Sequence, residues 1–223
     1  MTIEPDGTLL QMLTNVADGS SCYGDPTWTP TGDRIFFDGG TDTSSHLFSI
    51  AAAGGSMRQL LFGSAFDSDA AISPDGTRIA FDRGGGSSTD ASGIFLMNVD
   101  GSHLTRVTTP PAAAAGGDAF PSFSPDGTKL AFVRYGASDG TEGAIYIVGV
   151  DGKGLRQVTP APYIDAARPH WSPDGSKLLF GTPGSPVGVG GVRNVYVVNV
   201  DGSDLIELTH MVGNDFAENP AWS

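Results

Sequence analysis

One ten-residue stretch decides the fold: residues 72–81 read Ile-Ser-Pro-Asp-Gly-Thr-Arg-Ile-Ala-Phe. The pattern returns at 123–132 as Phe-Ser-Pro-Asp-Gly-Thr-Lys-Leu-Ala-Phe and at 171–180 as Trp-Ser-Pro-Asp-Gly-Ser-Lys-Leu-Leu-Phe, with a weaker copy at 28–37. Proline presets φ at the first central position of a turn, and glycine accepts a left-handed conformation. The stretch therefore predicts a tight turn that joins two β-strands, repeated along the chain.

A second pattern lies between these turns. Residues 94–102 read Ile-Phe-Leu-Met-Asn-Val-Asp-Gly-Ser, and similar runs surround Asp151-Gly152, Asp201-Gly202 and, in degenerate form, Gly54-Gly55. An apolar strand followed by Asp-Gly favours a hairpin into a fourth strand. Four short antiparallel strands in a repeat of about 50 residues indicate the blade of a β-propeller. The 3.6-residue apolar spacing of a helical repeat does not occur.

The repeat predicts a single all-β propeller domain over residues 1–223. Complete blades are expected at 15–61, 62–108, 109–159 and 160–209, with strands of partial blades at 1–14 and 210–223. Strands one and four of a blade lie about 14 Å apart, so the two chain ends cannot pair directly. We therefore expect a fragment of a larger propeller. The alternative is a small propeller with one imperfect blade, and in both cases unpaired terminal edges favour self-association.

The combined repeat resembles that of a known family. Pro-x-Trp-Ser-Pro-Asp-Gly-x-x-Leu-x-Phe, followed by an apolar strand and Val-Asp-Gly-Ser-x-Leu-x-x-Val-Thr, is similar to the TolB-type (WD40-like, PD40) β-propeller repeat of bacterial proteins. The resemblance implies a non-catalytic module for protein–protein interaction and a periplasmic or extracellular location. Similar repeats form the propellers of prolyl-oligopeptidase-like peptidases, oligogalacturonate lyases and bacterial sensor domains, so an enzyme's propeller portion or a ligand-sensing domain stays an alternative.

Composition narrows the partners. The net charge of -13 disfavours nucleic acid and anionic membrane surfaces as partners. It suits a basic protein face, a metal ion or a cationic ligand, and the alternative is that it serves solubility alone. No run approaches the roughly 18 apolar residues of a membrane helix, so membrane insertion is not expected. The N-terminus lacks a basic and an apolar segment, so no signal peptide is predicted and a cytoplasmic location stays open. Cys22 is the only cysteine, which rules out an intrachain disulfide.

Catalytic residues are not apparent in the sequence. The chain contains no Gly-x-Ser-x-Gly nucleophile motif, and the four histidines His46, His103, His170 and His210 stand singly, without ligand spacing. We therefore predict a non-catalytic protein without a resident cofactor. The tryptophans Trp28, Trp171 and Trp222 occupy the apolar position of a first strand, where packing between blades is the expected role.

Acidic residues precede each predicted first strand. First strands are innermost in a propeller, so these carboxylates are expected to ring one mouth of the central channel and to attract a basic protein segment or a cation such as Ca²⁺. The alternative is that they are ordinary loop residues, and their varied spacing from the strand aromatic argues against a tight metal cage. The residues are Asp25, Asp69, Asp118, Asp165, Asp215 and Glu218.

Overall fold

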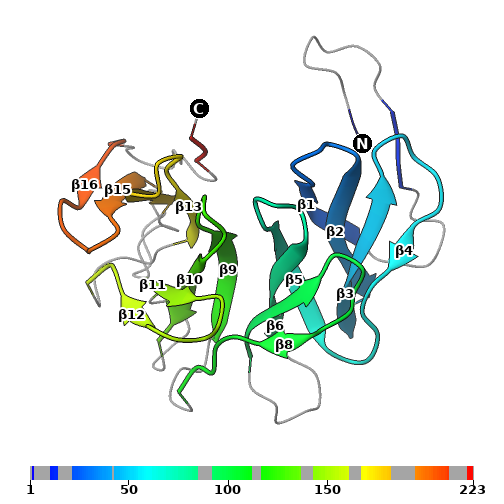
Figure 1. The fold of residues 1–223 in the computed structure, drawn as a ribbon, viewed down its shortest axis with the longest axis horizontal. Helices are drawn as coiled ribbons and strands as arrows, with labels where there is room; N and C mark the ends of the chain where they lie inside the picture. The colour runs from blue at the N-terminus through cyan, green and yellow to red at the C-terminus, as the bar shows by residue number, and fades with distance from the viewer. Residues whose placement is uncertain are drawn as a thin grey trace.

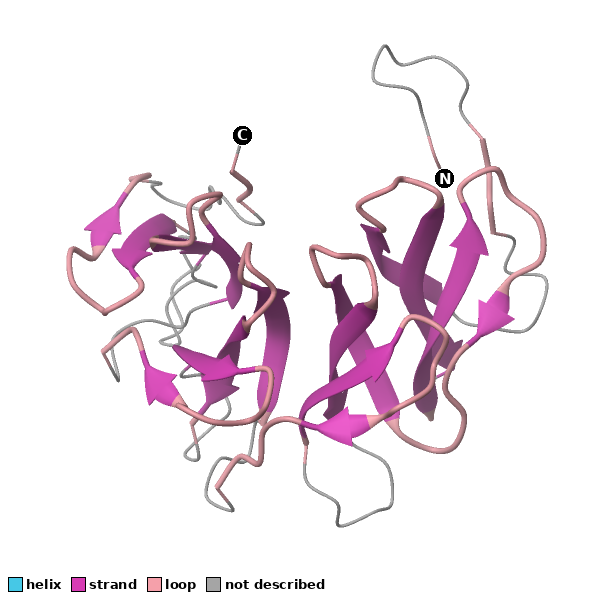
Figure 2. Ribbon diagram, viewed as in Figure 1, coloured by secondary structure: helices cyan, strands magenta, loops and turns pink. Residues whose placement is uncertain are grey.

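A computed structural model gives the fold of the chain. It describes residues 2, 11–14, 22–41, 43–84, 92–111, 117–136, 143–160, 167–181, 194–210 and 220–222. This part of the chain contains only strands, turns and loops (Figure 2). The strands are β1 Cys22–Trp28, β2 Arg34–Thr41, β3 Ser44–Ala51, β4 Arg58–Gln59, β5 Phe66–Ile72, β6 Arg78–Gly84, β7 Gly93–Asn98, β8 Thr105–Arg106, β9 Asp118–Phe123, β10 Lys129–Tyr135, β11 Gly143–Gly149, β12 Arg156–Gln157, β13 Ala167–Trp171, β14 Lys177–Gly181, β15 Val195–Asn199 and β16 Ile206–Glu207.

The strands form four antiparallel blades, β1–β4, β5–β8, β9–β12 and β13–β16, which we number blades 1 to 4. Within each blade consecutive strands are neighbours, as in the order β9-β10-β11-β12. Blades 1 and 2 are also joined by one parallel pairing, between Ser45 and Phe66. Figure 1 shows β5 and β9 close to the centre of the molecule, with β8, β12 and β16 toward its outside. The predicted propeller fold of four-stranded blades is therefore confirmed.

The Ser-Pro-Asp-Gly motifs form the same turn in blades 2, 3 and 4. In blade 2, Asp75 Oδ1 accepts hydrogen bonds from Ser73 Oγ at 2.6 Å, from Thr77 N at 3.0 Å and from Thr77 Oγ1 at 2.8 Å. Gly76 has a φ of 72°, which only glycine adopts without strain. Pro30 lies against this glycine, just as the motif proline of one blade lies against the motif glycine of the next at the two following interfaces. The motifs thus occupy matching places in successive blades.

Blade 1 builds the turn with an altered sequence. Its motif is Thr-Pro-Thr-Gly-Asp, so the carboxylate stands two positions later than in the other blades. Asp33 accepts hydrogen bonds from the hydroxyl groups of Thr29, at 2.7 Å, and Thr31. The weak copy of the motif therefore keeps a carboxylate at the centre of the turn.

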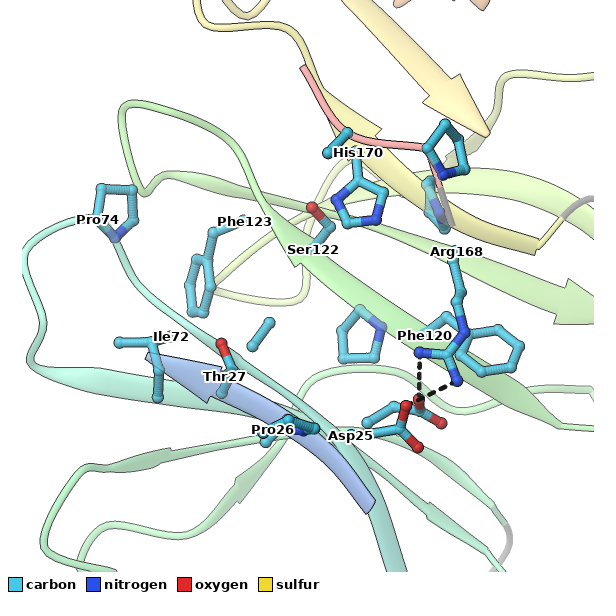
Figure 3. A pocket seen from close by; sticks show the side chains of 17 residues that line it. Asp25, Pro26, Thr27, Ile72, Pro74, Phe120, Ser122, Phe123, Arg168 and His170 are labelled. Atoms are coloured by element: carbon cyan, nitrogen blue, oxygen red, sulfur yellow. Dashed lines mark ion pairs between the residues drawn. The ribbon is translucent and has the colours of Figure 1, made fainter. Parts of the chain in front are cut away.

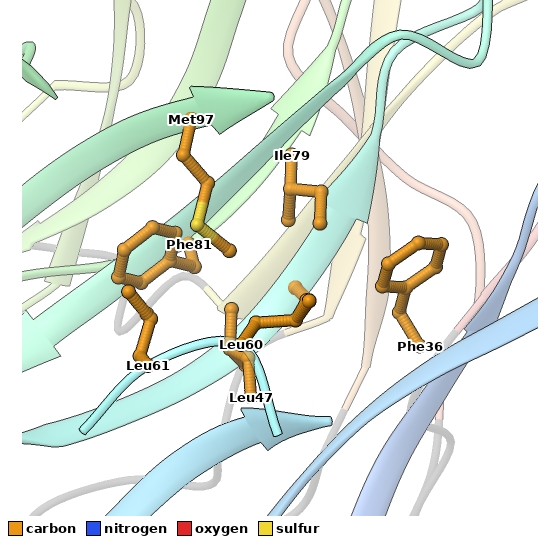
Figure 4. Packing of buried hydrophobic residues seen from close by; sticks show 8 residues of the cluster. Phe36, Leu47, Leu60, Leu61, Ile79, Phe81 and Met97 are labelled. Atoms are coloured by element: carbon orange, nitrogen blue, oxygen red, sulfur yellow. The ribbon is translucent and has the colours of Figure 1, made fainter. Parts of the chain in front are cut away.

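The larger hydrophobic clusters lie between neighbouring blades. Figure 4 shows the cluster between blades 1 and 2, where Phe36 and Leu47 of one blade meet Ile79, Phe81 and Met97 of the next. Each fully buried side chain of this size contributes about 1.5–3 kcal/mol of transfer free energy. The equivalent clusters are Ala80, Ile94, Leu96, Phe123, Leu130, Phe132 and Val148 between blades 2 and 3, and Ala131, Ile145, Ile147, Val158, Leu178, Phe180 and Val198 between blades 3 and 4.

The tryptophans of the first strands follow the same scheme. Trp171 packs on the cluster between blades 3 and 4. Its Nε1 donates a hydrogen bond of 3.1 Å to the carbonyl of Ser122 in β9, the first or inner strand of the preceding blade. Trp222 repeats this bond to the carbonyl of His170 at 3.2 Å, so residues 220–222 lie beside blade 4 as an inner strand would. Trp28 is 48% exposed, because no described blade packs on that side of blade 1. Self-association through such a face stays a prediction.

Candidate binding pocket at the channel mouth

Each inner strand carries a β-bulge at the same place. The register shifts between Gly24 and Thr27 in β1, and at the corresponding point of β5, β9 and β13. The bulged residue always stands three positions before the last residue of its strand and has a positive φ: 42° at Asp25, 50° at Asp69, 56° at Phe120 and 49° at Arg168. Positive φ is uncommon outside glycine, and bulges re-aim side chains next to binding sites. We call these four residues the bulge ring.

The bulge ring lines a pocket between the first strands of the four blades, which we call the mouth pocket. The cavity has a volume of about 510 Å³ and is lined by residues of β1, β5, β9 and β13, together with Pro220 and Ala221. Figure 3 shows the side chains of Asp25, Phe120 and Arg168 close together at one end of the pocket, with Ile72 and Phe123 at the other. The pocket therefore has a charged end and an apolar end, which suits a ligand of mixed character.

Arg168 connects the blades across the charged end. Its guanidinium lies 3.0 Å from Asp25 Oδ1 and 3.2 Å from Asp69 Oδ1, and 4.8 Å from the centroid of the Phe120 ring. Figure 3 draws both ion pairs. Arg168 belongs to blade 4, whereas the two carboxylates belong to blades 1 and 2. The arginine thus links the first strands of blades 1 and 2 to that of blade 4.

Two further carboxylates lie behind the ion pairs. Burial, and then the charge of Asp25, raises the pKa of Asp38. Burial raises the pKa of Asp82 well above its usual value, and the charge of Asp69 adds to the effect. Burial likewise raises the pKa of Asp69 to about 6, against the lowering effect of Arg168. Burial, with added repulsion from neighbouring carboxylates, thus favours the protonated form of Asp38, Asp69 and Asp82.

The structure brings together only part of the predicted acidic ring. Asp25 and Asp69 meet at the pocket, but Asp118 does not line it. The Asp118 side chain is fully buried in an ion pair with Arg134 and accepts a hydrogen bond from Thr108 Oγ1 at 2.6 Å. Asp118 stands two positions earlier in its strand than the bulge, where Asp67 stands in β5. Asp165, Asp215 and Glu218 lie outside the described residues.

Sequence reasoning missed Phe120 and Arg168. The feature that could have identified them is their spacing in the sequence. Both residues stand three positions before the aromatic residue that ends their strand, as Asp25 does before Trp28. A search restricted to carboxylates selected Asp118 instead, because the bulge position holds three different residue types.

The histidines do not form a site. His46 is 8% exposed and lies 3.6 Å from Asp67, His103 sits on an exposed turn beside Asn98, and His170 lines the mouth pocket. In the described ranges no group of three or more His, Cys, Asp or Glu residues has the geometry to hold a metal ion. The expectation of a Ca²⁺ ion at the acidic mouth stays a prediction. Nor does any helix long and apolar enough to span a bilayer occur in the part of the chain that the structure describes.

Comparison with known sequences yields partial matches. No family model matches the chain. An uncharacterized protein of Agrobacterium fabrum is 34% identical over 110 residues, which are 49% of this chain and 35% of that protein. The TolB homolog of Chlorobium luteolum is 31% identical over 146 residues, covering 47% of this chain and 33% of that protein. The matched part thus spans about a third of each relative.

Solved structures match over most of the chain. A protein assigned as TolB from Agrobacterium tumefaciens superposes with a TM-score of 0.69 at 22% identity, over 85% of this chain and 66% of its own. TolB from Acinetobacter baumannii gives 0.66 at 18% identity, over 87% of this chain and 45% of its own. The fold is that of a TolB-like β-propeller.

The TolB-like fold is shared with peptidase propellers. The propeller domain of the trilobed protease from Pyrococcus furiosus, described as having an open velcro topology, matches with a TM-score of 0.55 at 16% identity, over 85% of this chain and 58% of its own. Identities at this level show the fold alone, so the TolB-like propeller assigns no activity by itself.

Proposed function

We propose that this chain is a non-catalytic TolB-like propeller that binds a protein partner at the mouth pocket. The observation that carries the proposal is the convergence of the bulge ring on one cavity, with strained backbone at all four positions. Backbone strain of this kind persists where the surrounding structure holds a functional arrangement. The apolar end, formed around Ile72, Phe123 and Pro74, offers a surface for an extended segment of a partner.

The acidic character of the chain supports a basic segment as the bound element. The net charge is -13, and the pocket adds a local excess of carboxylates over its single arginine. A field of this sign speeds the approach of a cationic partner and is weakened by salt. The likeness to TolB supports the periplasm as the place where this partner is met.

The contacts of possible nucleophiles support a non-catalytic role. Ser102 Oγ lies 3.0 Å from His103 Nδ1, but it also lies 2.6 Å from Asp100 Oδ1, to which it donates. The equivalent turn of blade 4 keeps the bond from Ser203 to Asp201, with Asp204 in place of the histidine. The serine therefore serves turn geometry rather than a base-activated attack.

Capture of partners by a pocket-filled variant tests the proposal. Ala71→Trp places a large side chain in the pocket. Lys153→Trp is the control: it introduces the same side chain outside the pocket, at a position where the native lysine side chain is 85% exposed. Immobilised wild type and both variants would be incubated with an envelope extract at low salt. We expect at least one protein to be retained by wild type and Lys153→Trp and lost with Ala71→Trp. Equal retention by all three would contradict binding at the mouth.

A peptidase gate is the second candidate, with the likeness to the Pyrococcus propeller behind it. In that case the four blades would belong to a chain that also carries a hydrolase domain. Sequencing the coding region on both sides of these residues distinguishes the two functions. A hydrolase domain would favour the gate, and a signal peptide followed by an α/β domain would favour the interaction module.

A further inference from the structure

The strongest unassigned feature is the position of Arg168 itself. Its guanidinium is held by carboxylates from blades 1 and 2 and lies over the face of Phe120 from blade 3. Two carboxylates and an aromatic face are the groups that recognise an arginine in a binding site. All four residues occupy the bulge position of their strands, so three of the blades build a guanidinium site and the fourth fills it.

The carboxyl groups near the ion pairs keep unused hydrogen-bonding capacity with Arg168 in place. The Oδ1 atoms of Asp38 and Asp82 are buried, and each lacks a hydrogen-bond partner among the described residues. Asp82 Oδ2 accepts a hydrogen bond from Ser68 Oγ at 2.9 Å. A buried carboxyl oxygen without a donor is costly, so Arg168 leaves this group of carboxyls incompletely satisfied.

The occupant is also exchangeable. The side chains of Arg168 and Asp25 are 36% and 41% exposed, so solvent screens their attraction and this ion pair is weak. Both residues of the pair line the pocket, from which a second cation can approach. A cation that enters by this route meets the same two carboxylates and the same ring.

We propose that Arg168 is an intramolecular occupant of a guanidinium site, which an arginine or lysine side chain of the partner displaces. The inference rests on the proposed function, since it names the chemistry of the segment bound at the mouth. Arg168 then sets specificity in two ways: it blocks the pocket to neutral segments, and it makes binding an exchange of one cation for another.

Binding of a small cation tests this exchange. The probe is arginine blocked at both ends, N-acetyl-arginine amide, titrated by calorimetry or NMR at low salt and pH 7.5. The blocked citrulline derivative has nearly the same shape without the charge and is the ligand control. Arg168→Asn removes the occupant and suits a positive φ, since asparagine is enriched there. Arg168→Lys retains a cation. Arg156→Gln removes an equal charge from the exposed strand β12 and is the protein control.

We expect Arg168→Asn to bind blocked arginine at least fivefold more tightly than wild type, with Arg168→Lys and Arg156→Gln within twofold of wild type. Adding Asp69→Asn to Arg168→Asn should abolish the gain. The inference is overturned if Arg168→Asn binds no more tightly than Arg156→Gln, or if the citrulline derivative binds equally well.

A second measurement covers the case in which the variant does not fold. Should Arg168→Asn fail to fold, the Arg168 Nε–H resonance of the wild type replaces it: a shift on adding blocked arginine supports exchange, and no shift at saturating probe opposes it. If blocked arginine fails to displace Arg168 but Ala71→Trp still loses its captured partner, the exchange is wrong and the proposed function stands. If blocked arginine displaces Arg168 but wild type captures no protein, the exchange stands and the proposed function is contradicted.

Discussion

Arg134 donates two hydrogen bonds to the buried carboxylate of Asp118, at 2.6 and 2.8 Å. One blade earlier, Arg83 makes the same pair with Asp67, at 2.5 and 3.1 Å. Both aspartate side chains are fully buried, whereas the arginines keep 10% and 22% of their side chains exposed. Each pair ties the first strand of a blade to the second strand of the same blade.

Removing one partner of this pair should destabilise the propeller strongly. Asp118→Ala leaves Arg134 and Thr108 Oγ1 without their acceptor, and breaking a buried ion pair in this way costs about 3–5 kcal/mol. The free energy of unfolding in urea measures the change. Lys153→Ala is the control, because it removes an ion pair whose lysine is 85% exposed, and should leave the stability nearly unchanged. Similar stabilities of the two variants would contradict the buried role of Asp118.

The interface between blades 3 and 4 makes a second prediction. Phe180 is fully buried in that cluster, so Phe180→Ala should lower the free energy of unfolding by about 3–5 kcal/mol. Phe62 is 76% exposed and supplies the matched control. If Phe62→Ala were as costly as Phe180→Ala, the core would not lie between the blades as described.

The turn carboxylates predict a loss of stability in acid. Hydrogen bonds from a serine hydroxyl and from the residue after the glycine lower the pKa of Asp75, Asp126 and Asp174 to about 2. Their folded pKa lies below the unfolded value, so their contribution is present above about pH 4 and is lost as the pH falls toward 2. The triple Asp→Asn variant should be less stable than wild type at pH 6, and the difference should shrink at pH 2.5. A difference that stays constant with pH would contradict the predicted role of these charges.

Asp69 predicts the opposite dependence near neutrality. Its folded pKa of about 6 lies above the usual 3.8, so the folded protein holds a proton that the unfolded chain has released between about pH 4 and pH 6. Stability should therefore fall as the pH rises through this window, by roughly 2–3 kcal/mol. Asp69→Asn should remove most of that fall in urea unfolding series at pH 4.5 and pH 7.5. An unchanged fall in the variant would assign it to other groups.

The fold could be read from the repeat because its information is local. The Ser73-to-Phe81 segment specifies its own turn and the strand that follows, and the copies agree on the same blade. The mouth pocket needed the register of β1 against β2, in which Gly24 and Thr27 are separated by a bulge. No residue type marks that bulge, since it holds aspartate, phenylalanine or arginine. The position of Arg168 over Phe120 depends on how four blades close around an axis, and such long-range geometry has no sequence signature.

The distance between the bulges of blades 1 and 4 tests the account most directly. Asp25 and Arg168 are far apart in sequence, yet their charged atoms lie 3.0 Å apart over the channel. In a Cys22→Ser background, Asp25→Cys with Arg168→Cys should form an intramolecular cross-link with a short bis-maleimide, detected by mass spectrometry. Asp25→Cys with Lys153→Cys, which lies on an outer turn, should not. If both thiols of the first pair are modified singly and never joined, the inner strands do not face a common channel and the pocket does not exist.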